Sequence, residues 1–161
     1  MSEAGGVEAG RHHMALRVYY EDTDAAGIVY HAAYLAFAER ARTEMLRCVG
    51  LDHRTLRARF NVVFTVRRCI VDYLAPARLD DLLEVRTRAV RLGGASLDLE
   101  QRIFRQGRLL TLLEVRLALL GTDLRVARMP RQLAAALSRL REPAEDSAEA
   151  ASGAGRVELR A

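Results

Sequence analysis

The amphipathic segment that ends near Val49 constrains the fold of this chain more than any other feature. Its apolar residues recur at spacings of three and four, which predicts one apolar stripe along a helix. They are Tyr34, Phe37, Ala38, Ala41, Met45 and Val49. Gly50 is well placed to end the helix. At 1.5 Å per residue, a helix of about 18 residues spans about 27 Å, so it is long enough to lie across a whole sheet.

Four runs with an apolar period of two follow this helix and predict strands. Their ranges are 62–73, 82–92, 96–106 and 109–121. Gly93-Gly94 and Gln106-Gly107 separate the last three runs, and such pairs are typical of hairpins, so these strands are expected to be antiparallel neighbours. A further strand is expected at 15–20, a short helix within 51–60, and a last helix from Met129-Pro130 to about residue 141.

These elements predict an α+β fold in one domain over residues 14–141. A five-stranded antiparallel sheet wrapped around one long helix, with a short C-terminal helix, is the hotdog architecture. Residues 1–13 are rich in Gly, Ala and Glu, and residues 142–161 are acidic, so both ends are expected to be disordered. Open edge strands favour pairing between copies, so a symmetric dimer is the smallest expected assembly.

The charge of the chain points to an anionic ligand without identifying it. The formal net charge is +4, and every basic residue is Arg, since the sequence contains no Lys. Arg binds phosphate through a planar fork of donors, so the chain suits nucleic acid, an acidic protein or a polyphosphate such as coenzyme A. No apolar run reaches the length of a membrane helix, about 18 residues or more.

The N-terminus and the two cysteines indicate the compartment. The first ten residues hold Glu3 and Glu8 and no apolar block, so we expect no secretory signal and a cytoplasmic protein. Cys48 and Cys69 have no partners at zinc spacing and are expected to be buried free thiols.

Asp24 is the first candidate for chemistry. It precedes the expected helix start by about one turn, and Gly27 allows a tight turn between them. The first N–H groups of the helix, from about residue 30 to 33, lack intrahelical acceptors and carry the positive end of the dipole. An oxygen that gains negative charge could be held there while a nearby carboxylate attacks the same carbonyl or activates water.

A structural role for these residues is the commoner interpretation from spacing alone. Asp24 or Asp22 could simply cap the helix, but only one can occupy the cap, and Asp22 is the better candidate for a structural role. His31 could offer its backbone N–H to a substrate oxygen or be a surface histidine. The tyrosines that could line a substrate pocket, or else belong to the core, are Tyr20, Tyr30 and Tyr34.

The sequence lacks several other catalytic motifs. It contains no G-x-S-x-G, no Walker loop, no G-x-G-x-x-G and no cluster of metal ligands. A serine hydrolase is disfavoured, and an acid-driven mechanism without metal remains.

The segment VYYEDTDAAGIVYHAAYLAFAERARTEML closely resembles the signature of the 4-hydroxybenzoyl-CoA thioesterase-like hotdog enzymes, most of all the Tol-Pal-associated acyl-CoA thioesterase branch. The likeness continues through IVDYLAPARLDDLLEV and covers roughly residues 15–140. It implies that Asp24 is the catalytic carboxylate, as nucleophile or as base for water. It also implies that the backbone at His31 polarises the thioester carbonyl. With these roles assigned, we predict that Tyr20, Gly27, Tyr30 and Tyr34 contact the substrate.

The resemblance further implies the substrate and the partners. It implies an acyl-CoA substrate, with no cofactor beyond that coenzyme A and no metal, and a pocket between two subunits of a homodimer or a tetramer of dimers. It suggests contact with acyl carrier protein and a place near the inner membrane. Basic residues would hold the phosphates; the candidates are Arg67, Arg68, Arg88 and Arg128. Ala38 departs from the larger aromatic that relatives often carry, which would reshape the acyl pocket.

Besides a hotdog dehydratase, which would require a different placement of the catalytic His, two alternatives to an acyl-CoA thioesterase are kept. One is a non-catalytic module that binds acyl-CoA or acyl carrier protein, which a lack of turnover on any acyl chain length would favour. The other is nucleic-acid binding, which rests on the Arg content alone and requires salt-sensitive binding.

Overall fold

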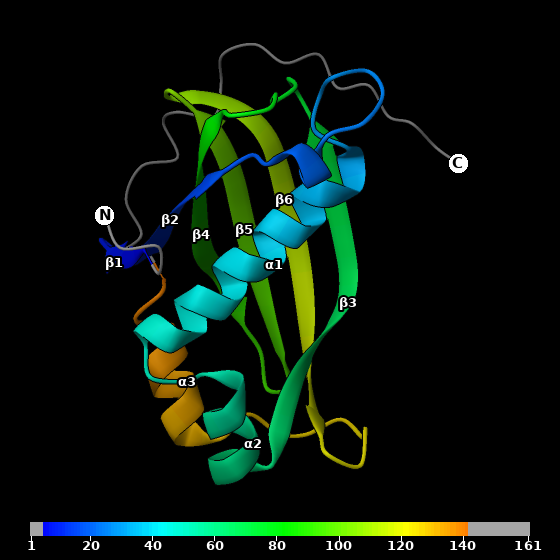
Figure 1. Cartoon of the computed structure of the whole chain (residues 1–161). Helices are drawn as coiled ribbons and strands as arrows, with labels where there is room; N and C mark the ends of the chain where they lie inside the picture. Colours follow the sequence, from blue (N-terminus) through cyan, green and yellow to red (C-terminus); the bar gives the residue numbers. More distant parts are fainter. Residues whose placement is uncertain (1–4, 142–161) are drawn as a thin grey trace.

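The computed structural model describes residues 5–141, in which one long helix lies on a six-stranded antiparallel sheet (Figure 1). The strands are β1 Gly6–Glu8, β2 Arg11–Arg17, β3 Val62–Tyr73, β4 Leu82–Leu92, β5 Ser96–Arg105 and β6 Arg108–Gly121. The helices are α1 His31–Cys48, α2 His53–Phe60 and α3 Arg131–Ser138, and a 3₁₀ turn spans Tyr20–Asp22.

The sheet has the strand order β1-β2-β4-β5-β6-β3, with β4, β5 and β6 joined by two hairpins as the glycine pairs predicted. Helix α1 crosses one face of the sheet diagonally, and α2 and α3 lie beyond its C-terminal end (Figure 1). Gly50 follows the end of α1 with φ +77°, in the left-handed region that ends helices. The predicted long helix across a sheet is confirmed.

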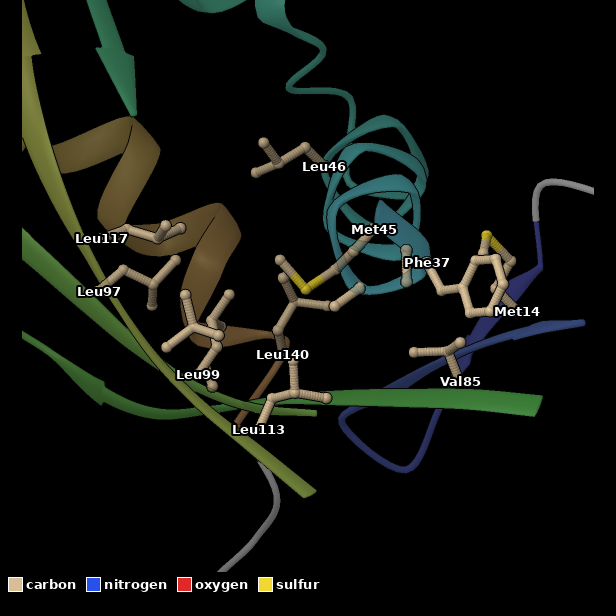
Figure 2. Close-up of a cluster of buried hydrophobic side chains, with 14 of the residues drawn as sticks. Met14, Phe37, Met45, Leu46, Val85, Leu97, Leu99, Leu113, Leu117 and Leu140 are labelled. Carbon is tan, nitrogen blue, oxygen red and sulfur yellow. The ribbon is translucent and has the colours of Figure 1, made fainter. Parts of the chain in front are cut away.

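The core lies between α1 and the inner face of the sheet. Phe37 and Met45 of α1 are fully buried, and Figure 2 shows them over the apolar side chains of the sheet. Leu140, just after α3, fills the same layer beside Leu99 and Leu113. Each such side chain contributes about 1.5–3 kcal/mol on burial, so this layer holds α1 and therefore its N-terminus in place.

A buried polar network also fixes α1 to the sheet. The side-chain amide of Gln101, on β5, donates to the Ala38 carbonyl (2.9 Å) and to the Thr87 hydroxyl (3.0 Å). The Arg42 guanidinium donates to the Gln101 Oε1 atom at 2.9 Å, and burial lowers the pKa of Arg42. Because Ala38 is fully buried against this network, its small side chain lets the helix backbone approach Gln101.

The start of the chain differs from the prediction. The first long strand is β2, Arg11–Arg17, rather than 15–20, and β1 precedes it, so the sheet has six strands instead of five. Residues 6–8 and 11–13, expected to be disordered, pair in a hairpin. The buried side chains of β2 are His12 and Met14, and a polar residue in the first of these positions hid the alternation. The expected disorder of 142–161 lies outside the described residues.

The cysteines differ as well. Both are free thiols, as predicted, but both are exposed in this chain rather than buried. Cys48 ends α1, and Cys69 lies on β3, an edge strand of the sheet. An apolar pattern indicates a strand, but it does not tell whether that strand is at the edge.

Candidate active site

Asp24 lies at the tip of a short hairpin that leads into α1. The Asp24 N–H donates to the Ile28 carbonyl (3.0 Å), and the Gly27 N–H donates back to the Asp24 carbonyl (3.0 Å). Gly27 has φ +73°, a conformation that glycine adopts at little cost, so the tight turn predicted there is present. Thr23 and Val29 form a bridge below the tip.

The two aspartates of this hairpin have different surroundings. Asp22 is 7% exposed, and its carboxylate accepts from the Tyr19 N–H at 2.8 Å, so its predicted structural role is confirmed. Asp24 is exposed, and its Oδ1 atom accepts from the Ala26 N–H at 2.8 Å. This bond holds the Asp24 carboxylate above its own turn, where it does not cap α1.

The N-terminus of α1 keeps unpaired donors. Its N-cap, Tyr30, makes no side-chain capping bond; the Tyr30 N–H donates to the Asp22 carbonyl, and the Ala33 N–H donates to Tyr30. Within the described chain, the N–H groups of His31 and Ala32 therefore remain available. Asp22, which accepts from the Tyr30 N–H, is two residues before Asp24 on the same arm of the hairpin. At 3.3–3.4 Å per residue, the Asp24 backbone is therefore about 7 Å from that hydrogen bond. The Asp24 carboxylate and these donors thus lie at the same end of α1.

Aromatic rings surround this helix start. The His31 ring packs on Tyr30 (4.4 Å between centroids) and faces Tyr73 edge-on (6.5 Å). The Tyr73 hydroxyl donates to the His31 carbonyl at 2.9 Å, which fixes the end of β3 to the start of α1. Tyr73 is not among the site residues predicted from the sequence, because its contact with α1 depends on how the helix crosses the sheet.

The remaining predicted tyrosines separate in space. Tyr34 is buried below the site, where its hydroxyl accepts from the Ala77 N–H at 2.9 Å. Burial raises the pKa of Tyr34, so the hydroxyl stays protonated at neutral pH. Tyr20 lies in the 3₁₀ turn and is 82% exposed, so no wall of a pocket forms around it in this chain.

Only two of the four predicted phosphate-binding arginines come together. Arg68 and Arg88 line a cavity of about 300 Å³ on the sheet face opposite α1, where Arg88 pairs with Glu100 (3.0 Å). Arg67 is exposed on β3, and Arg128 is exposed ahead of α3.

A second cavity, of about 510 Å³, lies at α2; its lining residues are His53, Arg54, Arg57, Ala58 and Val63. Neither of these two cavities of residues 5–141 includes Asp24, and the Asp24 side chain is exposed, so one side of the candidate site faces solvent in a single protomer.

Comparison with known proteins identifies the family. A sequence model described as the thioesterase superfamily matches residues 26–112, more than half of the chain, and this match includes the start of α1 and ends within β6. The chain belongs to the thioesterase superfamily. The matched range begins just after Asp24. It therefore consists of α1, α2 and most of the sheet and does not include Asp24 itself. The predicted family and hotdog fold are both confirmed.

Relatives of known name within the superfamily agree. The acyl-CoA thioesterase YbgC of Haemophilus influenzae is 41% identical over 127 residues, which cover 78% of this chain and 93% of that protein. The acyl-CoA thioester hydrolase YbgC of Escherichia coli O6:H1 is 57% identical over 88 residues, 55% of this chain and 65% of that protein. YbgC proteins form the Tol-Pal-associated branch that the sequence resembles.

Solved structures of the superfamily share the architecture. The crystal structure of a probable thioesterase from Bartonella henselae superimposes with a TM-score of 0.72 at 37% identity, covering 74% of this chain and 99% of that chain. In the part of our chain that the structure describes, every helix is too short or too polar to span a bilayer.

Proposed function

We propose that this protein hydrolyses acyl-CoA thioesters to a free acid and coenzyme A. The observation that carries the proposal is the pair of unpaired N–H groups at His31 and Ala32, beside the hairpin that holds Asp24. Membership of the thioesterase superfamily and two YbgC relatives named for acyl-CoA hydrolysis support the same chemistry.

In this mechanism the thioester carbonyl oxygen accepts from the N–H groups of His31 and Ala32, where the helix dipole stabilises the negative charge that develops. Asp24 attacks the carbonyl carbon, the C–S bond breaks, coenzyme A leaves as a thiolate, and water cleaves the resulting anhydride. Alternatively, Asp24 takes a proton from the water that attacks. Both routes give the same products and need no cofactor beyond the coenzyme A of the substrate.

The other predicted residues have supporting roles in this proposal. Gly27 permits the turn that presents Asp24, while Tyr30 and the His31 ring flank the acyl group. Tyr34 supports the site from below through its bond to Ala77. A substrate contact by Tyr20 stays a prediction, since its exposed ring requires something outside this protomer to complete a pocket.

A second copy of the chain closes the open side of the site in our proposal. The outer edge of β3 is unpaired in the sheet, and its middle residues are exposed, including Val66 (49%) and Ile70 (38%). An unpaired edge strand of 12 residues favours pairing with another strand. Tyr73, at the end of β3, contacts His31, so pairing at this edge brings a partner against the site.

The partners and compartment follow from the same proposal. Acyl carrier protein, which presents the same thioester on an acidic surface, is a second proposed substrate donor for this Arg-rich chain. We place the reaction in the cytoplasm near the inner membrane, with dimers or paired dimers as the working form.

The test is the Asp24→Asn variant, assayed against a series of acyl-CoA chain lengths. Asparagine keeps the oxygen that accepts from the Ala26 N–H, so the hairpin stays folded, but it can act neither as nucleophile nor as base. We expect kcat to fall by ~10² or more with an unchanged melting temperature.

Turnover by Asp24→Asn equal to that of the wild type would remove Asp24 from the mechanism. Tight binding of acyl-CoA by the wild type without turnover at any chain length would instead establish a non-catalytic binding module.

A further inference from the structure

The cavity at α2 is a concentrated positive site that the proposed chemistry leaves unused. Its lining includes three basic side chains, those of His53, Arg54 and Arg57, and no carboxylate. Within residues 5–141, no acidic side chain forms an ion pair with Arg54 or Arg57, and the Asp52 carboxylate, which caps α2, attracts Arg54 only at longer range. Both guanidinium groups are exposed and therefore free to bind an anion.

Local structure holds these arginines in position. Asp52 caps α2 by accepting from the Thr55 N–H at 2.7 Å, and Leu56 is fully buried beneath the helix. With Leu56 turned inward, Arg54 and Arg57 project together from the outer surface, because residues three apart share a helix face. The arrangement is a two-arginine clamp on a short, anchored helix.

The neighbouring groups complete the environment. His53 contacts the Thr43 hydroxyl through its Nε2 atom (3.2 Å), and Thr43 donates to Glu39 (2.8 Å), so the nearby Glu39 carboxylate is engaged away from the arginines. Two planar guanidinium groups next to a hollow suit the oxygens of a phosphate ester or a diphosphate, which they bind through pairs of hydrogen bonds.

The clamp cannot serve the Asp24 site of its own protomer. It lies beyond the C-terminal end of α1, whereas Asp24 lies at the N-terminal end, about 27 Å away for a helix of this length. The clamp does lie beside Val63, at the start of β3, while the active-site residue His31 is bonded to Tyr73, at the end of the same strand.

Antiparallel pairing of β3 with its copy reverses this relation. The start of one β3 then lies opposite the end of the other, so the α2 clamp of each protomer comes beside the α1 N-terminus of the other. We propose that Arg54 and Arg57 bind the nucleotide phosphates of the coenzyme A whose thioester is cleaved at Asp24 of the partner subunit. This inference rests on the proposed function and on the β3 dimer.

The first experiment compares substrates with and without the nucleotide. For Arg54→Ala/Arg57→Ala, we expect kcat/KM for an acyl-CoA to fall about 10- to 100-fold, mainly through KM, because charge-assisted hydrogen bonds to phosphate are lost. The acyl-N-acetylcysteamine thioester, which has the same reacting bond and no phosphate, should be hydrolysed as by the wild type. An equal loss on both substrates would overturn the proposal.

Arg59→Ala is the matched control on the same helix. Arg59 lies outside the cavity, packs over the Phe60 ring (5.2 Å) and donates to Gln132 (3.3 Å), so its loss should not change the ratio of the two substrates. If Arg59→Ala changed the ratio of kcat/KM for the two substrates to a similar extent, the effect would come from the general charge of α2. That result would contradict the clamp.

Subunit mixing tests whether the clamp acts across the dimer. Sedimentation first confirms a mass of about twice 17.9 kDa. Asp24→Asn protomers are then reassembled with Arg54→Ala/Arg57→Ala protomers. If the clamp serves the partner, each mixed dimer contains one intact site, and acyl-CoA hydrolysis rises above that of either variant alone. No recovery in verified mixed dimers would overturn the assignment to the partner.

Binding of adenosine 3′,5′-bisphosphate, measured by calorimetry, separates this inference from the proposed function. Binding that requires Arg54 and Arg57, in a protein that hydrolyses no thioester, would support the clamp and reject the thioesterase. Active hydrolysis by a wild type that binds the nucleotide no better than the variant does would reject the clamp and leave the thioesterase in place.

Discussion

At the scale of single residues, two carboxylates two positions apart have separate tasks. Asp22 is buried and holds the Tyr19 N–H, and its backbone carbonyl accepts from Tyr30 at the start of α1. Asp24 faces outward and holds only its own turn. The difference arises because the Asp22 side chain points toward the 3₁₀ turn, whereas Asp24 lies at the tip of the hairpin.

Substitution of Asp22 should therefore affect stability first. Asp22→Ala leaves the Tyr19 N–H without its acceptor, and we expect a loss of about 1–2 kcal/mol in the free energy of unfolding, as for loss of a capping residue. Asp22→Asn keeps an acceptor oxygen and should retain both stability and turnover. Urea unfolding of the two variants measures the difference; equal midpoints would show that the bond does not support the loop.

The local part of the candidate site could be predicted from the sequence, whereas contacts between distant segments could not. Asp24, Gly27, Tyr30 and His31 are local in the chain, and their arrangement follows from a turn and a helix start. Tyr73 lies at the site because α1 crosses the sheet next to the end of β3. The arginines of α2 have a role in our proposal only when a partner subunit lies beside them. Neither relation leaves a periodic signal in the sequence.

At the scale of elements, the buried amide of Gln101 connects β5 to α1 and to β4. It satisfies the Thr87 hydroxyl and accepts from Arg42, so three elements depend on one side chain. Buried polar groups of this kind cost free energy when one partner is removed. The network thus fixes the position of α1 along the sheet.

Gln101→Leu should destabilise the fold by about 1–3 kcal/mol, because the fully buried Thr87 hydroxyl and the partly buried Arg42 guanidinium each lose a partner. The double variant Thr87→Val/Gln101→Leu should recover part of that loss, since it also removes the stranded hydroxyl. Denaturant unfolding measures both. An unchanged midpoint for Gln101→Leu would show that the network contributes nothing to stability.

Strands β3 to β6 could be predicted closely, because β4 and β5 alternate apolar and polar residues and tight turns separate β4, β5 and the nearly continuous apolar run of β6. The hairpin of β1 and β2 could not. Its inward positions include His12, and its partner β1 is a short Gly-containing segment without apolar periodicity. Pairing with β4 stabilises β2, and such long-range support overrides weak local preference.

At the scale of the whole molecule, ion pairs cover the outer face of the sheet. Hydrogen bonds from Arg86, and also from His13, hold the pKa of Glu84 below its ordinary value. Arg116 lowers the pKa of Asp98 in the same way through two bonds, of 2.7 and 2.8 Å. These carboxylates therefore bind protons less readily in the folded state than in the unfolded chain.

Stability should accordingly fall in acid. The contribution of Glu84 and Asp98 is complete above their unfolded pKa values, about 4.3 and 3.9, and is lost as the pH falls through the lower folded values. Urea midpoints taken from about pH 6 to about pH 3 measure this loss. The variant Glu84→Gln/Asp98→Asn should show a shallower decline; the same decline in both proteins would place the acid sensitivity in other groups.

The covering of β2 by β1 limits how the molecule can grow. One edge strand of the sheet, β1, has three residues and offers too few backbone groups to pair stably with another chain. The other edge strand, β3, offers twelve residues. Once two molecules join at β3, the joined sheet presents only short margins at both ends. Growth by adding strands stops at the pair, so a concentrated solution should stay free of fibres.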